Sequence, residues 1–119
     1  MKVTNTYNAT IYCGFKKDGI PTGDGMYEPI AREAENILQE FCNNVGFCVT
    51  VKPTKFIYTG NNEEGIEVGI INYPRFPLSN SIIRSHAVEI ATRLMHEFNQ
   101  DRVSIVCSDQ TIMLENKNK

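Results

Sequence analysis

Residues 70–84, IINYPRFPLSNSIIR, decide the fold, because a strand must end and a helix must begin within them. Pro74 and Pro77 each lack a backbone N–H and push the preceding residue out of helical geometry. We therefore expect residues 73–77 to be a stiff, extended crossing. The helix should begin within residues 78–81, whose hydroxyl and amide side chains can cap free N–H groups.

On the C-terminal side of this stretch, residues 81–99 have the strongest helical periodicity in the chain. Apolar side chains recur there at three- and four-residue steps and predict a core helix: Ile83, Ala87, Ile90, Ala91, Leu94 and Phe98. Residues 102–107 then alternate between apolar and polar, and residues 111–115 form a further short run. The chain should therefore close with a hairpin of two strands.

On the N-terminal side, residues 66–73 are predicted as a strand that pairs with the β-branched and aromatic run 47–58. Pro53 lies inside that run and cannot donate to a sheet ladder. We therefore expect a bulge or break there, giving strand segments 47–52 and 54–58. Residues 59–65 are rich in Gly, Asn and Glu and are predicted as the turn.

The first third of the chain predicts a strand, a loop and a helix. Residues 9–15 alternate like a half-buried strand, and residues 26–44 carry a helical apolar stripe. Gly46 follows that stripe and can take the left-handed conformation of a helix C-cap. Between strand and helix, residues 16–25 are predicted to form a glycine-rich loop that could cover a ligand.

The predicted order is β-α-β-β-α-β with a short extra terminal strand, in a single domain over residues 1–119. This order is ferredoxin-like and predicts an α+β fold, an antiparallel sheet with both helices on one face. The other face would be bare, with a mixed set of exposed side chains: Tyr12, Thr50, Lys52, Tyr58 and Tyr73. Such faces are often buried by pairing, so we expect a homo-oligomer, a dimer or a hexamer.

Composition excludes several classes of function. A formal net charge of −2 and a pI near 5.7 give no basic field for duplex nucleic acid. No apolar run is long enough for a membrane span, so we expect a cytoplasmic protein. The four cysteines form no C-x-x-C pair and only two histidines are present, so we expect no metal site, no cofactor and no catalytic residue.

Arg75 and Phe76, between the two prolines, are the first candidates for ligand binding. An arginine and an aromatic ring beside a helix N-terminus suit a ligand with a phosphate and a flat ring. The alternative is structural: Phe76 would plug the core, Arg75 would be solvated, and the proline spacing would only end a strand.

A family resemblance sharpens this hypothesis. The segments FCVTVKPTKFIYTGNNEEGIEVGIINYPRFP (47–77) and QDRVSIVCSDQTIMLE (100–115) resemble the phage anti-Thoeris signal sponges, which sequester cyclic ADP-ribose signals. The resemblance covers roughly residues 47–115. It implies a non-enzymatic oligomer that binds cyclic ADP-ribose isomers, and also cyclic di- or trinucleotides, and releases them unaltered to block immune signalling.

The residue types are compatible with such a ligand. Arginine suits bidentate phosphate contacts, an aromatic ring can stack on adenine, and amides and hydroxyls can bond to ribose. The candidate ligand-binding residues are Asn72, Tyr73, Arg75, Phe76, Asn80, Arg84, Arg102 and Thr111. Two rival functions remain open, a small ferredoxin-like enzyme and a structural or interaction subunit. An enzyme would need a paired acid and base or a cofactor motif, and the sequence has neither.

Overall fold

The computed structural model describes residues 1–15 and 27–117 of the chain. Its seven elements follow the predicted order: β1 (Asn8–Gly14), α1 (Tyr27–Val45), β2 (Thr50–Tyr58), β3 (Asn61–Ile71), α2 (Asn80–Glu97), β4 (Arg102–Cys107) and β5 (Thr111–Glu115). The predicted loop over residues 16–25 lies outside the described residues. The assignment of residues 1–119 to one domain stays a prediction.

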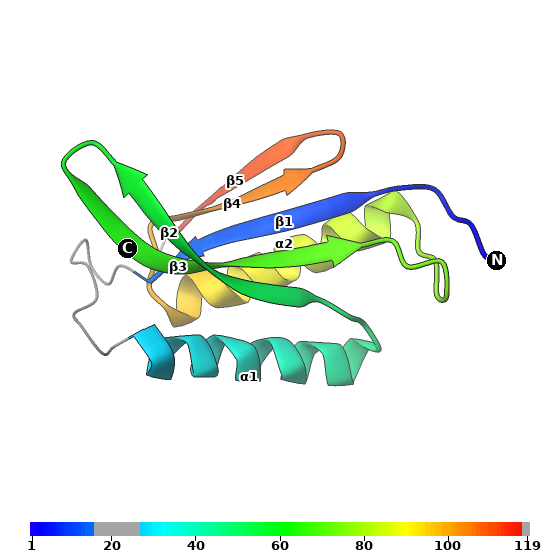
Figure 1. Ribbon diagram of the computed structural model, residues 1–119, viewed down its shortest axis with the longest axis horizontal. Helices are drawn as coiled ribbons and strands as arrows, with labels where there is room; N and C mark the ends of the chain where they lie inside the picture. The colour runs from blue at the N-terminus through cyan, green and yellow to red at the C-terminus, as the bar shows by residue number, and fades with distance from the viewer. Residues whose placement is uncertain (16–26, 118–119) are drawn as a thin grey trace.

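The five strands form one antiparallel sheet in the order β2-β3-β1-β4-β5. Strand β3 lies between β1 and β2, so the β1–α1–β2 crossover spans a strand, as in a split β-α-β unit. Both helices lie on the same side of the sheet (Figure 1). The predicted α+β fold is confirmed, and β2 and β5 form the two edges.

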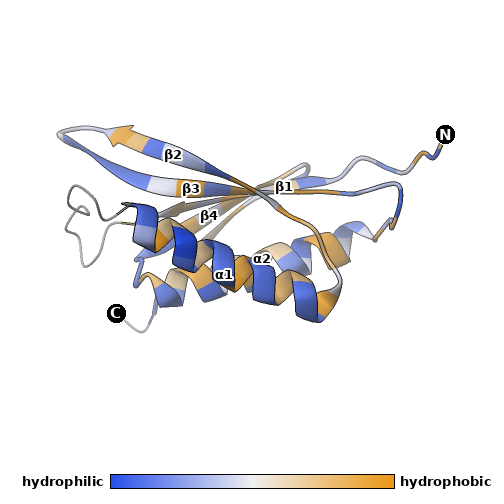
Figure 2. Ribbon diagram, turned by 60° about the horizontal axis from the view of Figure 1, so that its bottom comes forward, coloured by the Kyte–Doolittle hydropathy of each residue, from blue (hydrophilic) through white to orange (hydrophobic). Residues whose placement is uncertain are grey.

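The core lies between this sheet and its helices. Alternate residues of β1, β3 and β4 point toward the helices and are buried, because successive side chains of a strand face opposite ways. They are Ala9, Ile11, Cys13, Ile66, Val68, Ile70, Val103, Ile105 and Cys107. The predicted stripe of α2 packs on them, and Figure 2 shows hydrophobic and hydrophilic residues alternating along both helices.

The predicted break at Pro53 is wrong. Strand β2 is continuous, and Pro53 pairs in register with Ile66. Because β2 lies at the edge of the sheet, one side of it has no partner strand among the described residues, and a proline there removes no needed ladder donor.

The predicted turn over residues 59–65 is also wrong, because the loop holds only Thr59 and Gly60. Gly60 has a φ of +83°, which glycine adopts at no steric cost. The polar residues after it continue the strand, and one of them, Glu64, forms an ion pair with Lys55 at 3.5 Å.

The crossing at residues 73–77 is a turn and is not extended as predicted. The Phe76 N–H donates to the Tyr73 carbonyl at 3.1 Å, with Pro74 at the second position, where its fixed φ favours a β-turn. The predicted helix start is confirmed, because Ser79 caps α2 by accepting from the Ile82 N–H at 3.3 Å.

The C-cap predicted at Gly46 is also found. Its φ is +75°, and its N–H donates to the Cys42 carbonyl at 2.8 Å. Further along, His86 of α2 packs its ring against Phe47, with ring centroids 4.8 Å apart. None of the helices in the described residues is long and apolar enough to cross a membrane.

Candidate functional site

Asn72 is buried and holds three parts of the chain together. Its amide nitrogen donates to the Asn5 carbonyl at 2.9 Å and to Thr4 Oγ1 at 3.3 Å, and its amide oxygen accepts from the Leu78 N–H at 2.9 Å. The side chain therefore ties the N-terminal segment to the turn before α2, and its polar atoms are already engaged.

The turn residues form a small aromatic surface. Tyr73 and Phe76 have ring centroids 5.3 Å apart, and Phe76 is 39% exposed, so it does not plug the core. The Cys48 thiol contacts the Tyr73 hydroxyl at 3.6 Å, a contact that raises the pKa of Tyr73 together with partial burial. Arg75 is exposed beside them, and Asn80 is exposed at the start of α2.

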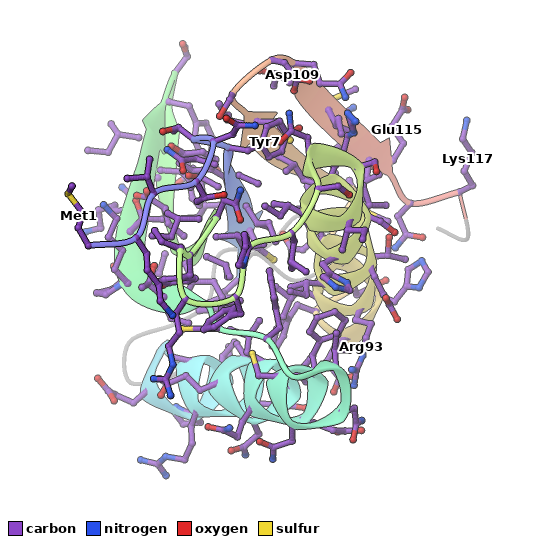
Figure 3. The ribbon with its side chains drawn as sticks, turned by 90° about the vertical axis from the view of Figure 1, so that its right-hand side faces the viewer. Met1, Tyr7, Arg93, Asp109, Glu115 and Lys117 are labelled. Carbon is purple, nitrogen blue, oxygen red and sulfur yellow. The ribbon has the colours of Figure 1, made fainter. Side chains whose placement is uncertain are left out.

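Arg84 lies in a different group, at the end of the sheet where β1 begins. Its guanidinium is 3.7 Å from Asp109. That carboxylate also accepts from the Tyr7 hydroxyl at 2.9 Å, and Figure 3 labels Tyr7 and Asp109 at the same end of the molecule. Burial raises the pKa of Tyr7, and the hydrogen bond to Asp109 adds to the effect. The positive charge of Arg84 is therefore paired with the carboxylate of Asp109. Thr111 starts β5, two residues after Asp109.

Arg102 is remote from the other candidates. It begins β4 just after the C-terminal end of α2, and it pairs in register with Glu115. A helix of 18 residues spans about 27 Å, so Arg102 and the turn before α2 lie at opposite ends of the molecule. The structure thus places the eight predicted residues in three separate groups, and their role as ligand contacts stays a prediction.

The face of the sheet opposite α1 and α2, which no helix of the described residues covers, has a different composition. Directly paired residues on neighbouring strands point to the same side, so the register lists its side chains row by row. One row crosses the sheet through Lys52, Glu67, Tyr12, Ser104 and Met113. The next row holds Thr50, Gly69, Thr10, Val106 and Thr111. Polar groups and a glycine therefore lie at the centre of this outer face.

A hollow of about 280 Å³ lies on the outer face over β1, β2 and β3. We call it the outer-face hollow; it is lined by Thr10, Thr50, Val51, Lys52, Glu67 and Gly69. Glu67 is the one carboxylate among these six residues, and its side chain is only 18% exposed. The volume of the hollow is just below the range of about 300–1,000 Å³ that is typical of small-molecule sites.

Gly69 shapes the floor of this hollow. A Cβ atom added at Gly69 would lie 2.5 Å from Oγ1 of Thr50, closer than real contacts allow. A glycine inside a strand often marks close approach of a ligand or of another chain segment. The missing side chain lets Thr50 lie across the strand and leaves the centre of the hollow open.

A second hollow of about 310 Å³ lies between α1 and the segment before β2. It is lined by Glu35, Leu38, Gln39, Cys42, Phe47, Cys48, Val49 and Val51. Its walls are mainly aliphatic, aromatic and thiol groups, and its carboxylate, Glu35, is on an exposed position of α1. Burial raises the pKa of the Cys42 thiol, and the nearby Cys48 adds to that shift. This second hollow therefore lacks a sheltered charge.

In the part of the chain that the structure describes, the cysteines and metal-ligating residues form no further centre. All four cysteines are free, and burial raises the pKa of the Cys13 thiol to about 12, so this group stays protonated. Within residues 1–15 and 27–117, no three His, Cys, Asp or Glu side chains are grouped so that they could hold a metal ion.

Known structures share this fold. A phage SAM lyase in complex with S-methyl-5′-thioadenosine matches with a TM-score of 0.76 and 14% identity, over 98% of this chain and 95% of that one. A phage SAM lyase in the apo state matches with a TM-score of 0.64 and 15% identity, over 93% and 90% of the two chains. No protein-family model and no curated protein sequence matches the chain. At these identities the likeness establishes the fold.

These structures correct the functional interpretation. The matches support a resemblance to phage proteins of this fold class. They give no support for the anti-Thoeris family. The hypotheses of a non-enzymatic sponge and of no enzymatic activity are wrong, because the matching structures are of a lyase, and the enzyme alternative fits better.

The predicted partners are corrected as well. The ligand held by the matching lyase is S-methyl-5′-thioadenosine, which is neither a cyclic ADP-ribose isomer nor a cyclic di- or trinucleotide. The homo-oligomer, a dimer or hexamer, also finds no support in these comparisons.

Sequence reasoning missed Glu67, Gly69 and Thr10, although it placed Thr50 and Lys52 on the bare face. Two signals could have found them. Glu67 stands between the inward-facing Ile66 and Val68, so alternation alone points it outward. Gly69 is an isolated glycine inside a strand pattern, which often marks a place where another segment or a ligand lies close to the backbone.

Proposed function

We propose that the chain is an enzyme that binds S-adenosylmethionine on the outer face of its sheet and cleaves it to S-methyl-5′-thioadenosine. The observation that carries the proposal is a fold shared over 98% of the chain with a phage SAM lyase that holds this product. The outer-face hollow supplies a second argument, since it offers a sheltered carboxylate to a cationic ligand.

The chemistry of this substrate needs little from the protein. The sulfur of S-adenosylmethionine is a sulfonium, so it leaves as a neutral thioether once the bond to Cγ of the amino-acid chain breaks. The electron pair of that bond stays on sulfur. In a lyase no water enters, so the four-carbon fragment must satisfy Cγ itself. Either its own carboxylate attacks Cγ and closes a lactone, or a proton leaves Cβ and a double bond forms.

Lactone closure requires no base and no metal ion. The reaction joins a carboxylate to a carbon beside a positive sulfur, and both charges disappear in the products. Holding the two ends of the substrate close together therefore supplies much of the catalysis, because correct orientation replaces a search among open conformers. Removal of water helps further, since water stabilises the separated charges of the substrate.

Glu67 is the residue that we assign to the sulfonium. Its carboxylate is sheltered by the neighbouring strands, so its attraction for a cation is screened less than that of a fully exposed group. Tyr12 pairs with Glu67 in register and presents an aromatic ring on the same face. The hydroxyls of Thr10 and Thr50 would then face the ribose, over the open floor at Gly69.

The test is direct. The purified protein is incubated with S-adenosylmethionine, and the products are separated by chromatography. We expect S-methyl-5′-thioadenosine to accumulate with time, whereas recovery of intact S-adenosylmethionine alone would refute the proposal. Place of action is part of the same proposal: the reaction would run in the host cell cytoplasm, where this soluble metabolite is available.

A matched pair of variants locates the site. Glu67→Gln should lower kcat/KM about tenfold to a hundredfold, which corresponds to about 1.5–3 kcal/mol for a lost contact to a charged group. Glu64→Gln is the control, because Glu64 also forms an ion pair with a lysine of β2, at 3.5 Å, but outside the hollow. Equal activity of both variants would place the reaction elsewhere on the protein.

A further inference from the structure

The carboxylate of the outer-face hollow already has a cation beside it. Nζ of Lys52 lies 3.6 Å from Oε1 of Glu67, across strands β2 and β3. The two side chains differ in exposure: Lys52 is 70% exposed, and Glu67 is 18% exposed. Glu67 is thus held against the sheet, while Lys52 reaches it from the solvent side of an edge strand.

The same hairpin carries a second lysine–glutamate pair for comparison. Lys55 and Glu64 lie 3.5 Å apart, and their side chains are 53% and 40% exposed. That pair is an ordinary surface contact with both partners in water. In the hollow, by contrast, Glu67 is sheltered and only Lys52 lies largely in water. The lysine can therefore leave at little cost, because an ion pair with a flexible exposed lysine contributes little stability.

We propose that Lys52 is a replaceable counter-ion of the site, an inference that rests on the proposed function. In the empty hollow its ammonium neutralises Glu67. The sulfonium of S-adenosylmethionine displaces it on binding, because both cations compete for one carboxylate. Cleavage converts sulfur into a neutral thioether that no longer holds Glu67, and the ammonium of Lys52 returns.

This exchange makes the site select by the charge at sulfur. A cationic ligand replaces a weak pair with a 70% exposed lysine by a pair sheltered inside the hollow, whereas a neutral thioether gains nothing from Glu67 and leaves Lys52 in place. The substrate is therefore held more tightly than its product, S-methyl-5′-thioadenosine, which favours product release. Because Lys52 is 70% exposed and Glu67 is 18% exposed, salt ions can reach the pair, and added salt should weaken the preference.

Binding measurements with three adenosyl compounds test the exchange. Sinefungin carries an ammonium near the position of the sulfonium and is not cleaved, S-adenosylhomocysteine has the same amino-acid tail with a neutral sulfur, and S-methyl-5′-thioadenosine lacks the tail. Lys52→Met removes the charge and keeps the chain length. We expect this variant to bind sinefungin about three- to tenfold more tightly and the two neutral thioethers within twofold of wild type.

Two further variants complete the design. Glu67→Gln should abolish the preference for sinefungin over S-adenosylhomocysteine, and Lys55→Met, the matched control, should leave all three affinities unchanged. Weaker sinefungin binding by Lys52→Met would overturn the proposal, because the lysine would then hold the ligand itself. An equal gain for neutral thioethers would overturn it too, since the lysine would then act by obstruction alone.

Failure of the underlying function gives a different result. A wild-type protein that formed no S-methyl-5′-thioadenosine and bound none of the three compounds would refute the proposed function, and the counter-ion role with it. A wild-type protein that cleaves S-adenosylmethionine, but whose Lys52→Met variant shows unchanged selectivity, would refute the counter-ion role alone.

Discussion

The two faces of the sheet are built from the same strands and differ in what fills them. On the helix-covered face, alternate residues such as Ile11, Val68 and Ile105 are fully buried, and their apolar side chains fill the core. On the outer face, the immediate neighbours of Ile11 and Val68 in sequence include Thr10, Glu67 and Gly69, which line a hollow of about 280 Å³. The helix-covered face therefore stabilises the fold, and the outer face is available for the proposed site.

Neighbouring residues of one strand can therefore have different roles, one in the core and the next in the outer-face hollow. Because side chains alternate, residue 11 belongs to the core and residue 10 to the hollow. Substitutions at neighbouring positions should therefore change different measured quantities, the free energy of unfolding on one face and ligand binding on the other.

The largest effect is expected from Ile11→Ala. Ile11 is 0% exposed at the centre of the sheet, so the variant loses apolar burial and leaves a cavity, at a cost of about 2–5 kcal/mol. Thr10→Ala, one residue away, should change stability by less than about 0.5 kcal/mol and weaken ligand binding instead. Urea unfolding and product assays on both variants measure the contrast. A strongly destabilised Thr10→Ala would show that the outer face is part of the core.

The second effect compares two glycines of β3. A Cβ atom at Gly65 would meet the backbone carbonyl of Cys13 and lie 2.6 Å from the Phe56 ring, so Gly65→Ala should cost about 1–3 kcal/mol. At Gly69 the added carbon meets only the Thr50 side chain, which can shift. Gly69→Ala should therefore fold with little loss and fill the floor of the hollow. Full activity of Gly69→Ala would move the ligand away from this floor.

Most of the fold could be predicted from periodicity. The stripe of α2 and the alternation of β1 and β4 give the elements and the faces, because burial imposes periods of 3.6 and 2 on the sequence. One error, the predicted break at Pro53, arises because the position of β2 at the sheet edge was not predicted. Pro53 is harmless only because β2 is an edge strand, and the sheet order that makes it an edge is not written in any local pattern.

The site was harder to predict, for a physical reason. Sequence analysis followed arginines and an aromatic ring near a helix start, but Arg84 is engaged with Asp109, and Arg102 lies at the far end of α2. The outer-face hollow joins β1 to the β2–β3 hairpin, which follows α1 much later in the sequence. The lack of an acid–base pair also argued against an enzyme, although the cleavage that we propose requires no acid–base pair, because a sulfonium already carries its leaving group.

Tyr7 is a polar exception on the helix-covered face, and its removal should have a moderate effect. It is 2% exposed, and its hydroxyl donates to Asp109 at 2.9 Å. Tyr7→Phe should cost about 1 kcal/mol, below the usual range of about 1.5–3 kcal/mol for bonds to charged groups, because Asp109 remains accessible to water. Thermal unfolding at pH 7 measures this difference, and a variant as stable as wild type would mean that the bond contributes nothing.

The pH dependence of Tyr7 gives a second readout. Burial raises the pKa of Tyr7 in the folded state above its ordinary value of 10.0. The unfolded chain therefore releases this proton first, and wild type should lose stability relative to Tyr7→Phe as the pH rises above about 10. An unchanged difference between pH 8 and pH 11 would contradict the assignment.

The smallest effect is expected where the two helices meet above the core. A hydrogen bond with Glu97 of α2 raises the pKa of Glu33, an exposed residue of α1, above its ordinary value of 4.5. A raised folded-state pKa favours the folded protein below pH 4.5, and this contribution is lost as the pH rises through the folded pKa. Glu33→Gln keeps a neutral donor for Glu97 at every pH. The difference in melting temperature between Glu33→Gln and wild type should therefore shift in favour of the variant between pH 4 and pH 7. Glu89→Gln, an exposed glutamate of α2, is the matched control, and an equal shift in both variants would mean that general surface charge, and not this contact between the helices, causes the change.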